Sequence, residues 1–294
     1  MAPYILDGAM GSEIIKRGVK LPKYIWSAWA NTTHPNLVKQ IHDEYVDSGC
    51  NYITTNTFRT TARAYIKTKI SLEKAKIMAH ESMKTAVSIA LESAKKQAKV
   101  LGAIAPLEDC YSPDLYPGYE KAKNEFSLIG KALILAGVDG LILETMNNIS
   151  ETTACLESIK RYNPLTWVSF NLKNSNHLQS GEKLNLALDS IKKFNVNCVL
   201  LNCNELNRTK DAMSVLANNC STKWGIYPNL GIGEPSLDGV IDEYAKDEEF
   251  VSVAREALSD CISVFAAINS TPCNPLSIIS LIAFPPAPPT PTTS

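Results

Sequence analysis

Short apolar runs alternate with amphipathic stretches along most of this chain, and this alternation restricts its fold more than any other feature. Several runs are continuously apolar, which is typical of parallel strands in a sheet that is covered on both faces. The intervening stretches space their apolar residues with a helical period. The runs are Tyr4–Gly8, Tyr52–Phe58, Val100–Pro106, Gly140–Met146, Thr166–Leu172, Cys198–Asn204, Lys223–Asn229 and, more weakly, Cys261–Ile268.

The stretches between these runs predict the helices. They are Pro35–Ser48, Ser71–Ala98, Lys121–Ala136, Glu151–Arg161, Glu182–Phe194, Arg208–Ala217 and Glu249–Ser259. Eight strand–helix units without a break in composition favour an α/β fold of one domain, a (β/α)8 TIM barrel over residues 1–284. A doubly wound sheet is the alternative. The proline- and threonine-rich segment 285–294 predicts a disordered tail.

The composition excludes several classes of protein. Of the 294 residues, 45% are hydrophobic and 20% are charged, as in globular proteins with a sizeable core. The net charge of −1 offers no basic surface for nucleic acid or for a membrane. No apolar run reaches the roughly 18–20 residues of a membrane span, and the first residues lack the pattern of a secretory signal. Because the eight cysteines form no CxxC pair, we expect free thiols and a cytoplasmic protein.

Polar residues stand where the predicted strands end. They are Asp7, Thr55, Asn56, Thr57, Glu144, Thr145, Asn171, Asn202, Cys203, Asn204 and Asn229. In a TIM barrel these ends share one mouth, where catalytic groups gather. Structural roles are the alternative, because Asp7 could form a turn with Gly8 and Thr or Asn could cap the next helix. As a set they favour a pocket for a small zwitterion, with Glu144 and Asp7 facing an ammonium group.

Several segments together resemble the homocysteine S-methyltransferase family, in the family's order over roughly residues 4–235. They are LDGAMGSEIIKRG (Leu6–Gly18), YITTNTFRT (Tyr52–Thr60), GAIAPLEDCYSPD (Gly102–Asp114), VDGLILETM (Val138–Met146), WVSFNLKNSNHLQSGEKL (Trp167–Leu184), LNCN (Leu201–Asn204) and WGIYPNLG (Trp224–Gly231). The resemblance implies a (β/α)8 barrel. It also implies methyl transfer from S-methylmethionine, S-adenosylmethionine or betaine to homocysteine, which gives methionine.

The resemblance further implies a zinc ion held by three cysteines, with the fourth position open to the substrate sulfur. Cys203 matches the first of these ligands. By the family pattern, Glu144 would hold the homocysteine amino group, and Asn229 would lie close to the metal. The pocket would be completed by Asp7, Gly8, Thr55, Asn56 and Thr57.

The chain departs from the family pattern at the other two zinc ligands. Ile268 and Asn269 stand where the adjacent cysteines belong. Ile cannot bind zinc, and Asn is a poor ligand for it. Cys273 is a weak substitute, and His34 is the histidine that we expect nearest the mouth. The sequence therefore predicts weak zinc binding or none.

Three interpretations of the sequence remain open. The chain could be a homocysteine methyltransferase with an altered metal site. It could instead be a homologue that binds an amino acid without methyl transfer. Thirdly, it could be a damaged or alternatively ended product, in which the residues after about Ser259 no longer encode the family's last strand.

Overall fold

The computed structural model describes residues 3–229, 231–232, 243–244, 247–259 and 264–265. Within this part, eight strands form one sheet in the order β1-β12-β9-β8-β5-β4-β3-β2, and all neighbouring strands are parallel. The strands are β1 (Tyr4–Ile5), β2 (Tyr52–Thr54), β3 (Lys99–Ile104), β4 (Gly140–Met146), β5 (Leu165–Phe170), β8 (Cys198–Glu205), β9 (Lys223–Asn229) and β12 (Val264–Phe265).

The two end strands of this sheet meet, so the sheet closes on itself. Leu6 and Tyr52 form a parallel bridge. On either side of it, the Asp7 amide donates to the Tyr52 carbonyl at 3.0 Å and the Asn51 amide donates to the Ile5 carbonyl at 2.8 Å. A closed ring of parallel strands is a barrel. The predicted TIM barrel is therefore confirmed, and the doubly wound sheet was the wrong alternative.

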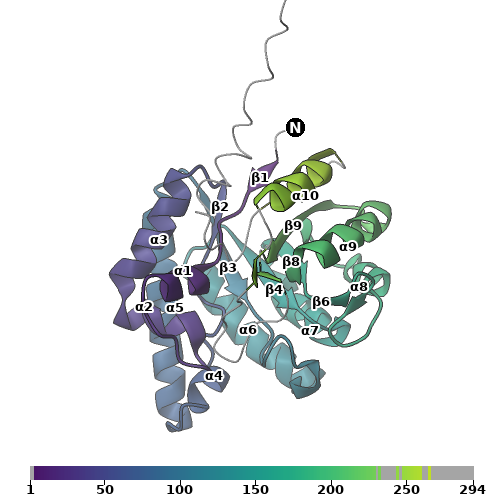
Figure 1. Cartoon of the computed structure of the whole chain (residues 1–294). Helices are drawn as coiled ribbons and strands as arrows, with labels where there is room; N and C mark the ends of the chain where they lie inside the picture. Colours follow the sequence, from purple (N-terminus) through teal and green to yellow (C-terminus); the bar gives the residue numbers. More distant parts are fainter. Residues whose placement is uncertain (1–2, 230, 233–242, 245–246, 260–263, 266–294) are drawn as a thin grey trace, which may run out of the picture.

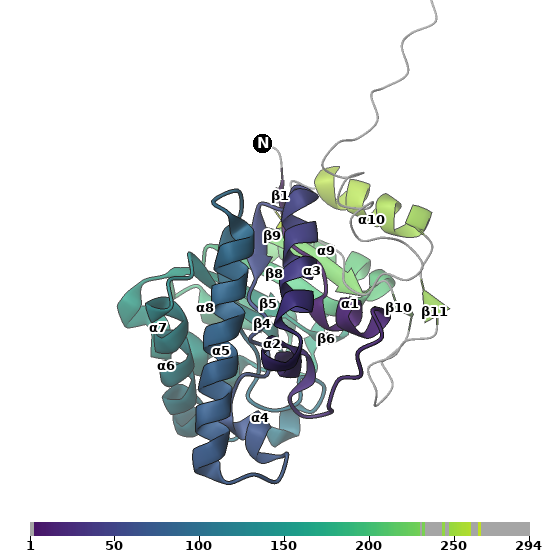
Figure 2. The same ribbon diagram turned by 90° about the vertical axis from the view of Figure 1, so that its left-hand side faces the viewer.

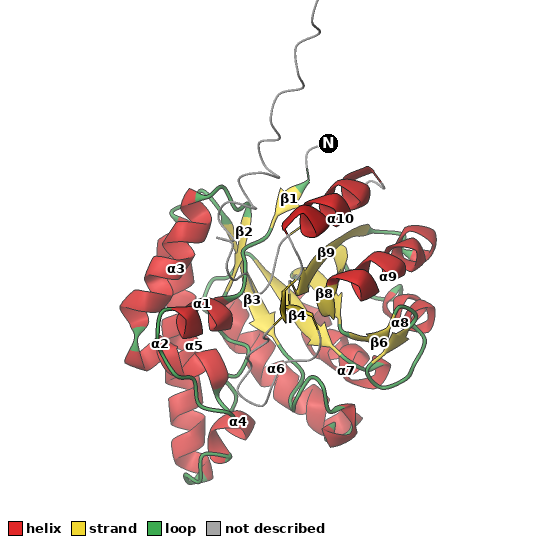
Figure 3. Ribbon diagram, viewed as in Figure 1, coloured by secondary structure: helices red, strands yellow, loops and turns green. Residues whose placement is uncertain are grey.

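Helices surround the ring of strands (Figures 1 and 3). They are α1 (Met10–Lys16), α2 (Ala30–Thr33), α3 (Pro35–Asp47), α4 (Ala62–Ile66), α5 (Leu72–Ala94), α6 (Tyr119–Leu135), α7 (Ile149–Ile159), α8 (Leu184–Ile191), α9 (Leu206–Asn219) and α10 (Asp247–Ser259). Figure 2 shows α5, which is the longest of them, running along one side of the barrel. None of the helices in the described part has the length and apolar composition that crossing a membrane requires.

Each predicted strand and helix has a counterpart in the described part, but several bounds differ, and the helices α1, α2 and α4 were not predicted. Gly140–Met146 and Lys223–Asn229 begin and end as predicted, whereas β1 and β2 are shorter than their apolar runs. Two antiparallel hairpins that the sequence did not predict follow β5 and β9. They are β6 (Leu172–Asn174) with β7 (His177–Leu178), and β10 (Gly231–Ile232) with β11 (Glu243–Tyr244). The predicted domain limit at 284 and the tail 285–294 lie outside the described residues.

Side-chain caps explain where two of the long helices begin. The Ser71 hydroxyl accepts a hydrogen bond from the Lys74 amide at 3.3 Å ahead of α5. The Asn148 side chain accepts from the Glu151 amide at 2.7 Å ahead of α7, and its own amide group donates back to the Glu151 carboxylate at 3.1 Å. Such caps satisfy amides that the first helical turn leaves without partners.

Apolar side chains fill the inside of the barrel below the strand ends. They are Leu6, Tyr52, Leu101, Ala103, Ile142, Trp167, Cys198, Leu200 and Tyr227. The Tyr52 and Trp167 rings pack with their centroids 4.6 Å apart. Cys198 is part of this filling, five residues before Cys203 on the same strand. The barrel is thus a packed core, and polar chemistry is confined to its carboxyl end.

One ionisable side chain is buried in the helical layer without a partner. His42 lies in α3, has no exposed surface, and neither ring nitrogen has a hydrogen-bond partner. Burial lowers the pKa of His42 from its ordinary 6.5 to about 4. The ring is therefore uncharged in the folded chain, where a charge would have no compensation.

We expect the free energy of unfolding to fall by about 3 kcal/mol as the pH drops from 6.5 to 4 because of His42. The pKa of His42 is lower in the folded state than in the unfolded state. As the pH falls from 6.5 to 4, the unfolded state therefore binds a proton that the folded state does not bind, and this favours unfolding. Substitution His42→Leu should remove this part of the pH dependence. Urea unfolding of both proteins at several pH values measures it, and equal slopes for parent and variant would contradict the assignment.

Candidate active site

Two acidic side chains lie at the carboxyl end of the barrel. Asp7, directly after β1, is 4% exposed, and its carboxylate accepts hydrogen bonds from the Thr54 amide at 2.8 Å and the Thr54 hydroxyl at 3.2 Å. Burial raises the pKa of Asp7 well above its ordinary value despite the bonds from Thr54, and the charge of Glu144 raises it further. The Glu144 carboxyl group is therefore close enough to oppose the ionisation of Asp7.

Glu144 on β4 is the second acid, and it has one hydrogen-bond donor within reach. The Tyr227 hydroxyl donates to its Oε1 atom at 3.4 Å. Burial raises the pKa of Glu144 from 4.5 to about 7, although the bond from Tyr227 opposes this shift. A carboxyl group in this state is ready to pair with a cation, because a nearby positive charge would favour its ionised form.

The Cys203 thiol sits on an irregular turn of the backbone at the end of β8. Its φ is +52°, and the pairing of β8 with β9 shifts register between Asn202 and Glu205. The sulfur accepts hydrogen bonds from Asn202 Nδ2 at 3.2 Å and from the Thr145 hydroxyl at 3.7 Å. Burial raises the pKa of Cys203, and the neighbouring Cys110 and Glu144 add to the shift. The isolated thiol is therefore protonated near neutral pH.

The loop after β3 brings two further side chains to Cys203. Cys110 is buried, and Tyr111 interacts with the amide group of Asn229 at the end of β9. Burial raises the pKa of Tyr111, and the Cys203 charge raises it further. Asn229 is 4% exposed, and its Oδ1 atom has no hydrogen-bond partner. A buried carbonyl oxygen without a donor marks a position where a ligand could supply one.

The three predicted residues after β2 have protein partners for their polar groups. Thr55 and Thr57 join their hydroxyls at 2.7 Å, and both also bond to the backbone of Ala103 on β3. Asn56 accepts from the Ser27 hydroxyl at 2.6 Å and donates to the Asn31 side chain at 2.7 Å. These bonds tie the end of β2 to its surroundings. A ligand-binding role for Thr55, Asn56 and Thr57 remains a prediction.

Gly8 allows the chain to pass close to helix α3. A Cβ atom at this position would lie 2.6 Å from the Tyr45 hydroxyl. Any other residue would push Tyr45 or the loop after β1 aside. Gly8 therefore shapes the edge of the mouth next to Asp7, and a direct contact between Gly8 and substrate remains a prediction.

The described residues do not fit a zinc ion bound by three thiolates. No three His, Cys, Asp or Glu side chains are grouped for a metal in this part of the chain. Ile268, Asn269 and Cys273 lie outside the described residues. The His34 ring contacts the Thr33 hydroxyl at 2.9 Å and packs on Trp29. Of the predicted thiolate ligands, Cys203 is the one that the structure places.

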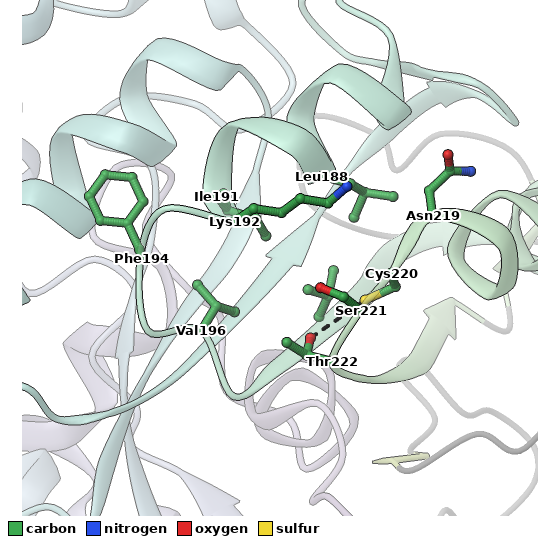
Figure 4. Close-up of a pocket in the computed structure, with 10 residues that line it drawn as sticks. Leu188, Ile191, Lys192, Phe194, Val196, Asn219, Cys220, Ser221 and Thr222 are labelled. Carbon is green, nitrogen blue, oxygen red and sulfur yellow. Dashed lines mark hydrogen bonds between the residues drawn. The ribbon is translucent and has the colours of Figure 1, made fainter.

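A small cavity at the opposite end of the barrel does not belong to this site. It lies between the end of α8 and the turn before β9, and its lining includes Lys192, Val196, Cys220 and Thr222 (Figure 4). These residues stand near the amino ends of β8 and β9, where TIM barrels concentrate stability rather than catalysis. We assign this cavity no role in function.

Several side chains at the mouth were not predicted as site residues. They are Cys110, Tyr111, Ser169 and Tyr227. Tyr227 precedes Asn229 by two residues and Ser169 precedes Asn171 by two, so the alternation of side chains along a strand places each pair on one face. That signal could have identified Tyr227 and Ser169. Cys110 and Tyr111 come from a long loop, for which the sequence offers no such rule.

Comparison with known proteins gives a consistent picture. Residues 4–265 match the sequence profile of the family described as Homocysteine S-methyltransferase. The homocysteine S-methyltransferase of Escherichia coli is 28% identical over 240 residues, and the alignment covers 77% of each chain. The homocysteine S-methyltransferase YbgG of Bacillus subtilis is 27% identical with the same coverage. A selenocysteine methyltransferase of Astragalus bisulcatus is 26% identical and covers 84% of this chain and 82% of its own.

Solved structures agree in fold. The metallated form of the homocysteine methyltransferase MmuM from Escherichia coli superposes with a TM-score of 0.80 over 96% of both chains, at 22% identity. The oxidized form of the same protein superposes with a TM-score of 0.81. At this level of identity the likeness concerns the barrel and not the details of the site.

We expect Glu144→Gln to flatten the pH dependence of stability between about pH 4.5 and pH 7. The folded pKa of about 7 lies above the ordinary 4.5, so the contribution of Glu144 is complete below pH 4.5 and is lost as the pH rises through 7. The free energy of unfolding in urea, measured for parent and variant across this range, checks it. Glu120→Gln, at an exposed position on α6, is the control and should follow the parent.

Proposed function

This chain belongs to the homocysteine S-methyltransferase family, and from that premise we propose that its barrel mouth binds homocysteine for methyl transfer to the sulfur. The observation that supports this most is the meeting of Asp7, Glu144 and Cys203 at one end of the barrel, where the charge of Glu144 raises the pKa of both Asp7 and Cys203. Two acids beside a thiol suit an amino acid that carries an ammonium group at one end and sulfur at the other.

The amino end of homocysteine would pair with Glu144. With a pKa of about 7, this side chain is partly ionised at neutral pH, and an ammonium group beside it would complete the ionisation. Asp7 adds a second acceptor next to it, already oriented by Thr54. The charge on the ligand thus offsets the burial of two carboxyl groups.

The sulfur end would lie among Cys203, Tyr111 and Asn229. Transfer from a sulfonium donor, S-methylmethionine or S-adenosylmethionine, forms the S–CH3 bond of methionine. It breaks the bond between that carbon and the donor sulfur, which leaves as a neutral thioether. Homocysteine must lose its thiol proton, because the thiolate is the nucleophile and a free thiol has a pKa of about 8.5.

Binding without transfer is the second candidate, and one observation favours it. The sequence has Ile268 and Asn269 where the family pattern has cysteines. A homologue of this kind would keep the amino-acid pocket and lose the activation of the sulfur. The two candidates share the homocysteine-binding step, and methyl transfer takes place in the first of them alone.

We expect homocysteine to raise the thermal unfolding midpoint of the purified chain, since a ligand that binds only the folded state stabilises it. The effect should grow as the pH rises through about 7, because Glu144 then ionises while the ligand amine stays protonated. Glu144→Gln should lose most of it, and Glu120→Gln should keep it. A parent that homocysteine does not stabilise at any pH would refute the proposed binding.

Methyl transfer should depend on Cys203. We expect Cys203→Ser to abolish methionine formation from homocysteine and either sulfonium donor, measured by mass spectrometry. Cys220→Ser, which alters a half-buried thiol at the far end of the barrel, should have no effect. Equal activity of Cys203→Ser and the parent would exclude a role for this thiol.

Metal analysis of the same preparations separates the two candidates. One zinc ion per chain that disappears in Cys203→Ser would support the transferase. A zinc-free protein that forms no methionine but is still stabilised by homocysteine would support the binding homologue.

A further inference from the structure

A line of polar side chains crosses the mouth from the Glu144 carboxylate to the Cys203 thiol. It passes through Tyr227, Ser169 and Asn202, and its members come from β4, β9, β5 and β8. These four strands are neighbours in the sheet. These strands therefore form one continuous wall of the barrel, and the Tyr227 side chain on one side of this wall reaches Glu144 on the other.

Each step of this line is a contact between neighbouring side chains. The Tyr227 hydroxyl donates to the Glu144 carboxylate at 3.4 Å and lies next to the Ser169 hydroxyl, whose own proton is directed to Asn202. The Ser169 hydroxyl donates to Asn202 Oδ1 at 2.5 Å, and Asn202 Nδ2 donates to the Cys203 sulfur at 3.2 Å. The part of the line from Ser169 to Cys203 is thus continuously hydrogen-bonded, and Tyr227 joins it through its contact with Ser169.

Burial leaves the side chains that make these contacts little freedom to change orientation. Ser169 and Asn202 have no exposed surface, and Tyr227 is 2% exposed. The Asn202 amide has a protein partner at both ends and so no remaining need for water. Polar groups enclosed in this way keep one orientation, because any other orientation would leave a donor or acceptor unpaired.

Asn202 also holds two unusual backbone conformations together. Thr145 has a φ of +62° and Cys203 a φ of +52°, both in the left-handed region that such residues rarely adopt. The Thr145 amide donates to Asn202 Oδ1 at 3.2 Å, and Asn202 Nδ2 donates to the Thr145 hydroxyl at 2.8 Å. Strained backbone conformations persist where several surrounding contacts hold them in place, and they concentrate at functional sites.

We propose that Tyr227, Ser169 and Asn202 are positioning residues that fix the separation between the Glu144 carboxylate and the Cys203 thiol, and so select amino-acid thiols by chain length. This inference rests on the proposed binding of homocysteine. A ligand held by its ammonium group at Glu144 has to place its sulfur beside Cys203. Cysteine is one methylene shorter. If the separation between Glu144 and Cys203 is fixed, cysteine cannot contact both side chains at once.

The test compares the dissociation constants of homocysteine and cysteine for the parent and for Ser169→Ala. One methylene changes affinity by roughly 10- to 200-fold in a rigid pocket. We expect the parent to favour homocysteine within that range and Ser169→Ala to lose most of the preference. Ser158→Ala removes another buried hydroxyl, which lies on α7 and bonds to the Cys155 carbonyl, and should keep the preference. Unchanged selectivity in Ser169→Ala would overturn the proposal.

Ser169→Ala should still fold, because Asn202 Oδ1 keeps the Thr145 amide as a donor. Tyr227→Phe is a second variant that keeps the ring and removes the hydroxyl between Glu144 and Ser169. It should also reduce the preference for homocysteine. If it and Ser169→Ala both discriminate as the parent does, these hydroxyls do not set the spacing.

A separate measurement distinguishes failure of this inference from failure of the proposed function. If the parent binds neither amino acid, the proposed function fails. The alkylation rate of Cys203 by iodoacetamide at one pH, read by peptide mass spectrometry, then tests the positioning itself. Ser169→Ala should change that rate and leave the rate of Cys220 as it is. An unchanged Cys203 rate would show that the line does not position the thiol.

Discussion

The site at the barrel mouth exists because the residues after β1 pair with the start of β2. Through the Leu6–Tyr52 bridge an eight-stranded sheet becomes a ring, and the carboxyl ends of all its strands come to face one mouth. In an open sheet Asp7 and Glu144, on strands at the first and sixth places of the order, would stand far apart. Closure brings their carboxyl groups within electrostatic reach of one another and creates a polar site above an apolar core.

The sequence allowed the barrel to be predicted because its signals are local and repeated. Parallel strands buried on both faces carry apolar runs, so β4 and β9 could be located from Leu141–Leu143 and Trp224–Tyr227, with polar residues at their carboxyl ends. The end of β8 was recognised for the same reason, but the conformation of Cys203 was not. Its positive φ depends on Asn202 and Thr145, which lie 57 residues apart, and no local pattern reports such a contact. Tyr111 reaches the mouth through a loop and escaped prediction for a similar reason.

Family membership and chemistry are separate questions for this chain. The match extends to residue 265, and Asp7, Glu144 and Cys203 at the barrel mouth all precede this point. Of the three thiolates that the family pattern implies, the described part has Cys203, and burial raises the pKa of this thiol rather than preparing it as an anion. The similarity in fold to a metallated relative does not make Cys203 part of a metal site, because the function of a barrel depends on the residues at its mouth.

The wall from Glu144 to Cys203 draws its members from four adjacent strands, while Gly8, Cys110 and Tyr111 belong to loops after β1 and β3. This arrangement divides the mouth into a part held by bonds across several strands and a part carried by single loop segments. A change in the wall disturbs buried bonds on several strands at once, whereas a change in the loops alters one segment. Divergence within such a scaffold can therefore alter the loop side chains around the mouth one segment at a time, while the wall of four strands stays as it is.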